Sequence, residues 1–331
     1  MTDQSPAYRV SLVIPVYCGE QTLPSLLQKI VPLTSEQTTS RGNRFVISEV
    51  LLVHDCGPDR SDRTIETLCA TYPFFRPVWL SRNFGQHPAT LAGMASTTGD
   101  WVATIDEDGQ QDPADVGNML DCALTGSLQL VYAQPINPPP HGWLRNMMSR
   151  TAKGIAAKLI GNRSFEHINS FRLIDGEIAR TLAAYCGSGV YLDVALFWVV
   201  GQVGQCPVRL NAELNRGGEN SSGYSYLKLL SHFWRLLLTS GVGPLRLITL
   251  FGFAAMGLAL LIAGYAVYGK FSYQVPIQGW TSLVIINAFF GGSILTALGI
   301  IAEYLAVTMG IAMGKPLYVV ATKPTRPPTR R

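Results

Sequence analysis

The sequence predicts an α/β fold with a mostly parallel sheet, joined to an apolar region that begins after Leu245. Three observations lead to this fold class. Short apolar runs with strand character alternate with helical segments at the spacing of βαβ units. Polar clusters follow these strands, which places them along one edge of the sheet, where ligands bind. Long uncharged runs fill the C-terminal part of the chain.

Composition narrows the class of protein further. Of 331 residues, 47% are hydrophobic and only 15% are charged, whereas a soluble domain usually has about 25% charged residues. A net charge of +4, with no basic run beside aromatic residues, does not favour nucleic-acid binding. The six cysteines show no CxxC pair and no zinc spacing, which indicates reduced thiols. The N-terminus has no signal-peptide pattern, so we expect a cytosolic first domain.

The first part of the chain is predicted to alternate strands and helices. Strands are expected over residues 9–16, 45–53, 77–80, 101–105 and 128–133, and helices over 23–30, 64–70, 89–95 and 118–124. The first strand is nearly all apolar, as a strand buried on both faces should be. No Gly-x-Gly-x-x-Gly follows it, which argues against an NAD-type fold.

The main chemical signal follows the strand that ends at Ile105, where the sequence continues Asp106-Glu107-Asp108. Carboxylates at this edge of an open α/β sheet lie where ligands bind. Asp106 and Asp108 are two residues apart, so both could reach one hard cation, Mg²⁺ or Mn²⁺, that bridges a diphosphate. The alternative is a solvated acidic turn, because charge clusters in loops are usually hydrated.

Two segments have the pattern of helices that lie on a membrane surface. The segment 143–160 is amphipathic and all its charges are basic, as in helices that bind anionic lipid. An ordinary surface helix is the alternative for this segment. Residues 224–240 repeat the theme with Trp234 and basic residues directly before the apolar region. There we expect an interfacial, juxtamembrane helix.

Two uncharged runs, 247–268 and 280–302, are long enough to cross a bilayer. The link between them is short, so they are expected to form a transmembrane hairpin within 246–305. Basic residues precede the first run and follow the second, which predicts that both ends, including a basic tail over 306–331, face the cytoplasm. Glu303 and Tyr304 are then expected near the cytoplasmic interface. The alternative is a helical hairpin buried in a soluble domain.

In their order and spacing, several motifs resemble those of family-2 glycosyltransferases that load a sugar onto a polyprenyl phosphate. The resemblance covers nearly the whole chain and rests on Ile14-Pro15-Val16-Tyr17 with Glu20, Leu80 to His87, Asp106 to Gln110, Phe171-Arg172-Leu173, Gly243 to Arg246, and Glu303-Tyr304. It implies a GT-A type, Rossmann-like domain over 1–223, followed by the two amphipathic helices and the hairpin.

The resemblance also implies roles for individual residues. The nucleotide is expected to contact Pro15, Tyr17, Glu20, Asp55 and Asp106. The cation, Mg²⁺ or Mn²⁺, is expected on Asp106, Asp108 and Gln110. The acceptor phosphate is expected on Arg145 and Ser149, with Arg150 as a further candidate, and Arg216 is expected to close on the donor diphosphate. Asp193 either orients the acceptor or acts as a base, or it is only a helix-start carboxylate.

Some positions depart from the pattern of this family, among them His54, Pro135, Ser170 and Gly223. His54 replaces an acidic residue near the base, which leaves the choice of nucleotide open. Ser170 stands where an Asp often precedes the Phe-Arg-Leu landmark, and we assign it no catalytic role.

The resemblance implies an inverting enzyme that moves a sugar, with UDP-hexose as the expected donor, to undecaprenyl phosphate at the cytoplasmic face of the inner membrane. The expected partners are the donor, the lipid phosphate and the bilayer, with a homo-oligomer also expected from the family and no nucleic acid. One alternative is a membrane-anchored nucleotide-sugar-binding pseudoenzyme, motivated by His54 and Ser170. Another is a processive glycan synthase, which the absence of Gln-x-x-Arg-Trp weakens.

Overall fold

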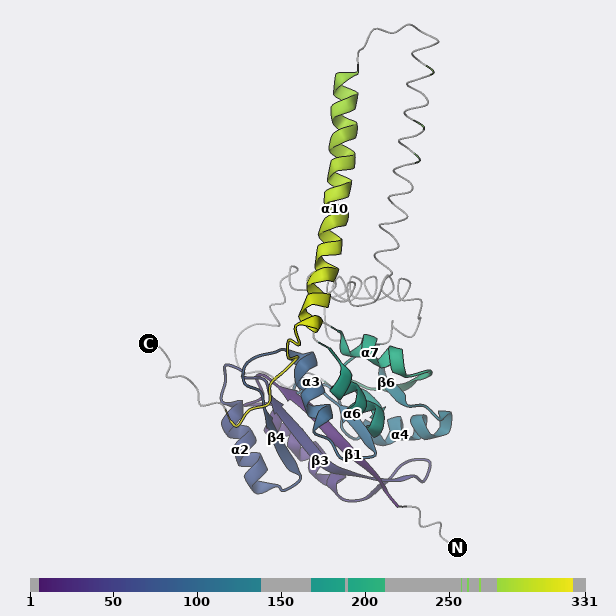
Figure 1. Ribbon diagram of the computed structural model, residues 1–331. Helices are drawn as coiled ribbons and strands as arrows, with labels where there is room; N and C mark the ends of the chain where they lie inside the picture. The colour runs from purple at the N-terminus through teal and green to yellow at the C-terminus, as the bar shows by residue number, and fades with distance from the viewer. Residues whose placement is uncertain are drawn as a thin grey trace, which may run out of the picture.

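The computed structural model describes residues 6–137, 168–187, 190–211 and 279–323, together with positions 257, 261 and 268. Figure 1 shows a twisted sheet with helices on both faces and one long helix that projects away from it. The predicted interfacial helices 143–160 and 224–240 lie outside the described residues. The predicted first span, 247–268, does so too, apart from the three single positions.

The first half of the sheet is parallel, as predicted. β1 (Tyr8–Val16) lies between β3 (Arg44–His54) and β5 (Trp101–Thr104), and it is parallel to both. β4 (Phe75–Trp79) is parallel to β3 on its other side. The carboxyl ends of these strands therefore meet at one edge of the sheet, where the polar clusters follow them.

The second half of the sheet is mixed, so a mostly parallel sheet describes only part of the architecture. β7 (Arg172–Asp175) lies between β5 and β6 (Leu130–Pro135) and is antiparallel to both. β8 (Val203–Val208) is parallel to β6, and the short β2 (Gln37–Thr38) is antiparallel to β3. Because β7 runs in the opposite direction, its first residue, Arg172, pairs with Thr104 at the end of β5. This reversal brings the residues around 170 to the acidic loop.

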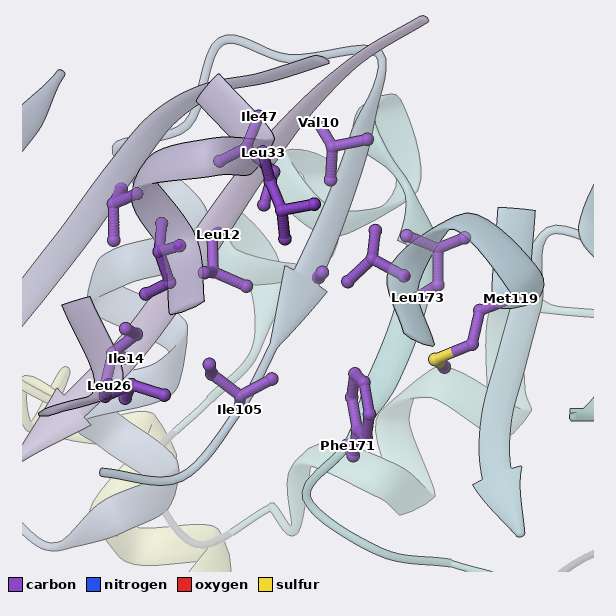
Figure 2. Close-up of a cluster of buried hydrophobic side chains, with 14 of the residues drawn as sticks. Val10, Leu12, Ile14, Leu26, Leu33, Ile47, Ile105, Met119, Phe171 and Leu173 are labelled. Carbon is purple, nitrogen blue, oxygen red and sulfur yellow. The ribbon is translucent and has the colours of Figure 1, made fainter. Parts of the chain in front are cut away.

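Helices cover the two faces of the sheet over separate hydrophobic clusters. One cluster, part of which is drawn in Figure 2, holds Leu12, Ile14 and Phe171 and is covered by α1 (Leu23–Ile30), α2 (Ser61–Thr71) and α4 (Asp115–Gly126). The other holds Val13 and is covered by α3 (Gln86–Ala95), α6 (Gly176–Tyr185) and α7 (Leu192–Val199). A short 3-10 helix, η1 (Val31–Thr34), follows α1. Alternate residues of β1 thus point to opposite clusters, as strand geometry requires.

The projecting helix, α10 (Trp280–Ala312), has 33 residues and is therefore about 50 Å long. Within it, the stretch Phe289–Ala312 has the length and the mean hydropathy, 1.9, that a membrane crossing needs, and none of its apolar window is buried in the protein. Among the described residues it is the one such stretch, so the two-helix hairpin stays a prediction. The span was predicted to end at 302, and the helix continues for ten more residues and includes Glu303 and Tyr304; the end of the span itself stays a prediction.

After α10 the chain returns to the sheet domain (Figure 1). Gly314, with a φ of +64° in the left-handed region, follows the helix end, where glycine is the favoured residue. Residues Lys315–Lys323, which we call the return segment, then form an antiparallel bridge between Val320 and Leu80. Within the predicted basic tail over 306–331, helix and bridge extend as far as Lys323, and residues 324–331 lie outside the described part. The cytoplasmic location of the tail stays a prediction.

Candidate active site

A cavity of about 290 Å³ opens at the edge of the sheet where β1 and β5 end. Pro15 and Thr104 lie at its base, and Asp106 follows β5 into it. The first residue of α3, Gln86, and the first residue of β7, Arg172, also line it. Of the residues predicted for the site, Pro15, Asp106 and Asp193 line this cavity.

The Asp106 carboxylate is held by three side chains from different elements. Gln86 Nε2 donates to Oδ1 at 2.5 Å, Gln111 Nε2 donates to Oδ2 at 3.2 Å, and the Ser170 hydroxyl donates to Oδ2. Burial raises the pKa of Asp106, the Ser170 hydrogen bond opposes that effect, and the charge of Asp108 adds to it. Asp106 and Asp108 are therefore close enough to interact electrostatically. Their proximity costs energy unless a positive charge is placed between them.

The loop that carries the acidic pair has oxygen donors suited to a hard cation. Gly109, at φ +72°, turns the chain directly after Asp108, and Asp108 Oδ1 accepts a hydrogen bond from Gln110 N at 3.0 Å. The described residues contain no group of three or more His, Cys, Asp or Glu placed to hold a metal. Two carboxylates nevertheless fit Mg²⁺, which commonly takes one or two protein carboxylates and fills its shell with water and phosphate oxygens.

Glu107, between the two aspartates, ties the acidic loop to the loop that follows β1. Its side chain is buried, and its two carboxylate oxygens accept from Tyr17 N at 3.1 Å and Cys18 N at 2.9 Å. The Tyr17 side chain is 45% exposed beside it. Glu107 therefore fixes the backbone of the predicted nucleotide site, a role that the sequence analysis did not assign.

Asp55 is placed at the predicted nucleotide site and also holds a neighbouring loop. It is buried, and its oxygens accept from Phe84 N at 2.7 Å and Gly85 N at 2.8 Å. Burial raises the pKa of Asp55, and these two hydrogen bonds oppose the increase. Glu20 is exposed, and its carboxylate accepts from Arg60 N at 3.0 Å. Contact of Asp55 and Glu20 with a nucleotide stays a prediction.

Asp193 lies in the first turn of α7, as predicted, and forms a buried polar cluster with Arg172 and Tyr132 in the cavity wall. Asp193 is 1% exposed, Arg172 Nη2 lies 3.3 Å from its Oδ1, and the Tyr132 hydroxyl donates to Oδ1 at 2.6 Å. Burial lowers the pKa of Arg172, but the neighbouring charges, with Asp193 the largest of them, together outweigh burial, and the net shift is upward. Burial and Asp193 together raise the pKa of Tyr132 well above its usual value. Asp193 is thus a charge-balanced carboxylate.

The structure adds residues that the sequence analysis left without a role. These are Gln86, Gln111, Ser170 and Arg172, which contact Asp106 or Asp193. Gln86 and Arg172 stand inside motifs that the sequence analysis had singled out, so motif membership was an available signal. The predicted acceptor residues Arg145, Ser149 and Arg150, and the predicted loop residue Arg216, lie outside the described residues. Gln110 is described, and its backbone carbonyl accepts from Asn211 N at 2.7 Å.

The family model and two relatives that match this chain are all named as glycosyl or sugar transferases. The family model described as Glycosyl transferase family 2 matches residues 11–201. The chain is 24% identical to a bactoprenol glucosyl transferase of Shigella phage SfX, over 95% of this chain and 99% of that one. It is also 24% identical to an undecaprenyl-phosphate 4-deoxy-4-formamido-L-arabinose transferase of Klebsiella pneumoniae (strain 342), over 99% and 98%.

A solved structure shares the fold. Glucosyl-3-phosphoglycerate synthase from Mycobacterium tuberculosis, in complex with uridine-diphosphate, is 20% identical to this chain. The match covers 71% of this chain and 80% of that one, with a TM-score of 0.50. At this identity the likeness concerns the arrangement of strands and helices.

Proposed function

Since the chain belongs to glycosyltransferase family 2, we propose that it transfers a sugar from a nucleotide-sugar donor to a polyprenyl phosphate. The acceptor class is supported by relatives of nearly equal length whose names contain bactoprenol or undecaprenyl-phosphate. The name of the first relative specifies transfer of a glucosyl group, and the name of the second specifies transfer of a modified arabinose. From the family resemblance, UDP-hexose is the proposed donor and undecaprenyl phosphate the proposed acceptor.

The observation that carries the proposal is the acidic pair at the end of β5, beside the cavity. Asp106 and Asp108 would hold Mg²⁺ or Mn²⁺, which when bound neutralises charge on the leaving diphosphate. Gln86, Gln111 and Ser170 orient the Asp106 carboxylate for that task. Such preorganised partners matter because a carboxylate that must reorient loses part of its stabilising effect during the reaction.

The chemistry requires no strong base in the cavity. An oxygen of the lipid phosphate, already ionised near neutral pH, attacks the anomeric carbon and forms the new C–O bond. The bond from that carbon to the diphosphate oxygen breaks with its electron pair on the leaving nucleotide, and the configuration inverts. Asp193 is balanced by Arg172 and bonded by Tyr132, so we propose that it shapes the acceptor side of the cavity and does not remove a proton.

We place the reaction at the cytoplasmic face of the inner membrane. The unburied apolar stretch of α10 supports membrane association, and the proposed topology keeps two spans with the sheet domain and the C-terminus in the cytoplasm. Arg145, Ser149 and Arg150 are proposed to bind the acceptor phosphate, because an Arg fork matches two phosphate oxygens. Arg216 is proposed to close on the donor diphosphate, and a homo-oligomer is proposed from the family resemblance.

A second candidate is a nucleotide-sugar-binding protein without transfer activity. Ser170, at a position where family members often have Asp, donates its hydroxyl hydrogen to Asp106. A hydroxyl there supplies one negative charge fewer near the cation. We prefer the enzyme because both Asp106 and Asp108 are retained.

The test uses the purified full chain in detergent with Mn²⁺, a panel of labelled nucleotide sugars and undecaprenyl phosphate. We expect label in the lipid phase, lost in Asp108→Ala and strongly reduced in Arg145→Ala. Glu177→Ala is the matched control, because Glu177 is an exposed carboxylate in the first turn of α6, at the opposite edge of the sheet. Donor binding without transfer across the panel would favour the second candidate, and release of long polymer would favour a processive synthase.

A further inference from the structure

The return segment continues the sheet domain at the end of β4. Ala321 N donates to the Trp79 carbonyl at 2.9 Å, and Ser81 N donates to the Val319 carbonyl at 2.9 Å. These two bonds flank the bridge between Leu80 and Val320. Leu80 is completely buried, and its own N–H donates to the His54 carbonyl at 3.1 Å. The end of β4 is thus held from both sides, by β3 and by the return segment.

Apolar and charged side chains hold the same segment in place. Leu317 and Tyr318 pack against the hydrophobic cluster under α3, α6 and α7. Lys323 Nζ lies 2.6 Å from Glu66 Oε1 on α2 and 5.6 Å from the centre of the Trp79 ring. An exposed ion pair of this kind contributes little alone. Its value here is that it fixes the far end of a segment already held by two backbone hydrogen bonds.

The end of α10 also contacts Gly187, four residues before the cavity-lining Tyr191. A Cβ atom at Gly187 would lie 3.7 Å from Cγ1 of Ile311, in the last turn of α10. A few residues later, Tyr191 lines the cavity and contacts the ring of His87, with 3.9 Å between ring centres. The end of α10 and the return segment therefore contact the two stretches of chain that continue to the cavity-lining residues Gln86 and Tyr191.

The loop between Ser81 and Gln86 connects the return segment to Asp106. The N–H of its first residue, Ser81, donates a hydrogen bond to the Val319 carbonyl. The N–H groups of Phe84 and Gly85 donate hydrogen bonds to the Asp55 carboxylate. Gln86 then donates to Asp106 at 2.5 Å. A loop fixed at two points before it reaches the cavity can present Gln86 in one position. A loop fixed at one point loses part of that order, because each free residue regains backbone conformations.

We infer that the return segment is a positioning element for the cavity. By holding Leu80 and Ser81 it orders the loop between Ser81 and Gln86, and it thereby couples α10 to the residues that hold Asp106. The positioning stands on the contacts alone. A further consequence rests on the proposed function: if α10 lies in a membrane, its position there sets the position of the cavity residues.

The test compares two proline variants of the full chain in detergent by hydrogen exchange of the 79–87 region. Ala321→Pro removes the N–H that bonds to Trp79. Val320→Pro is the matched control, because in this antiparallel register the Val320 N–H points away from β4. We expect exchange in the 81–85 amides to become about threefold to tenfold faster in Ala321→Pro, as the loss of one net hydrogen bond predicts, and to stay unchanged in Val320→Pro.

Equal exchange in Ala321→Pro and the unmodified protein would overturn the inference, as would an equal increase in both proline variants. If Ala321→Pro does not fold, Lys323→Glu replaces it, with Lys323→Glu/Glu66→Lys as the charge-restoring control. In the transfer assay, the donor KM is expected to rise several-fold in Ala321→Pro, with kcat within about twofold. Hydrogen exchange does not depend on transfer, so a protein that transfers no sugar would refute the proposed function and leave this inference testable.

Discussion

The hydroxyl of Ser170 donates a hydrogen bond to Oδ2 of Asp106, although the two residues lie 64 positions apart in the chain. The antiparallel insertion of β7 beside β5 creates this contact, because it places the start of β7 next to the end of β5. Thr104 reinforces it by donating its hydroxyl hydrogen to the Ser170 carbonyl at 2.6 Å. The side chain at 170 therefore controls the orientation of a proposed metal ligand.

Ser170→Ala is expected to weaken Mn²⁺ binding about 10-fold to 100-fold, as is typical when a partner of a metal-binding carboxylate is removed. The measurement is the Mn²⁺ concentration that gives half-maximal transfer, supported by direct Mn²⁺ titration. Ser170→Thr keeps the hydroxyl and serves as the control, with near-normal affinity. Unaltered Mn²⁺ affinity in Ser170→Ala would show that the hydroxyl does not support the site.

Arg172→Met is expected to destabilise the fold by about 3 to 5 kcal/mol, because it leaves the buried Asp193 carboxylate without its balancing charge. The side chains of this pair are only 4% and 1% exposed. The measurement is denaturant unfolding in detergent. The double variant Arg172→Met/Asp193→Asn should lose less stability than the sum of the two single variants, and strict additivity would contradict the ion pair.

Asp193→Asn tests the role of Asp193 separately. If Asp193 only shapes the cavity wall, transfer per folded molecule should fall modestly, by about tenfold or less, a smaller loss than removing a general base usually produces. The fraction of folded protein should fall as well, because the neutral amide that replaces the Asp193 carboxylate cannot balance the positive charge of Arg172. A loss of transfer beyond about a thousandfold in fully folded Asp193→Asn would identify Asp193 as a base instead.

Glu49 predicts a pH dependence of stability at the opposite edge of the sheet. Burial raises its pKa, but hydrogen bonds from Ser11, Thr98 and Arg76 outweigh burial, so the pKa lies below its ordinary value. A lowered pKa in the folded state adds stability above the unfolded value of about 4.3, and this stability is lost as the pH falls through the folded value. Glu49→Gln should therefore be less stable than the unmodified protein at pH 6 to 7.

The measurement is thermal unfolding of both proteins in detergent from pH 7 down to pH 3.5. The difference between them should shrink as the pH falls below about 4, where the Glu49 carboxyl binds a proton in the unfolded chain while the folded protein still keeps it ionised. A difference that is constant across this range would mean that the contribution of Glu49 does not depend on its charge.

Gly57→Ala should disrupt the loop after β3, because a Cβ at this position would lie 1.4 Å from the Tyr17 carbonyl oxygen. Backbone cannot yield as a side chain can, so we expect a loss of about 2 to 3 kcal/mol and weaker nucleotide binding. Gly201→Ala is the control, since no atom lies within 4 Å of its added Cβ. Both effects are measured by unfolding and by UDP titration, and equal behaviour of the two variants would contradict the close approach.

The parallel half of the sheet was predictable because each strand is a local apolar run followed by a polar cluster. Asp106 was predictable for the same reason, since it directly follows such a run. The antiparallel β7 was not, because nothing local in Arg172–Asp175 states which neighbours it joins or in which direction. The bond between Ser170 and Asp106 depends on that pairing and could not be read from either residue.

The roles of Glu107 and Asp55 were hidden for a different reason. Both are carboxylates beside a predicted ligand site, and residue type alone does not separate a ligand contact from a bond to nearby backbone. Glu107 binds the N–H groups of Tyr17 and Cys18, and Asp55 binds those of Phe84 and Gly85. The return segment was not anticipated because the basic residues of this region indicated only a tail after the apolar run, whereas Leu317 and Tyr318 pack against the core.

The bridge between Leu80 and Val320 has a consequence for biosynthesis. A ribosome makes Leu80 long before Val320, and in between it must produce the whole of α10. Nascent domains fold from the N-terminus as they emerge, so the edge of β4 stays incomplete until Val320 has been synthesised. The contact that completes this edge can therefore form only after the whole of α10 has been made.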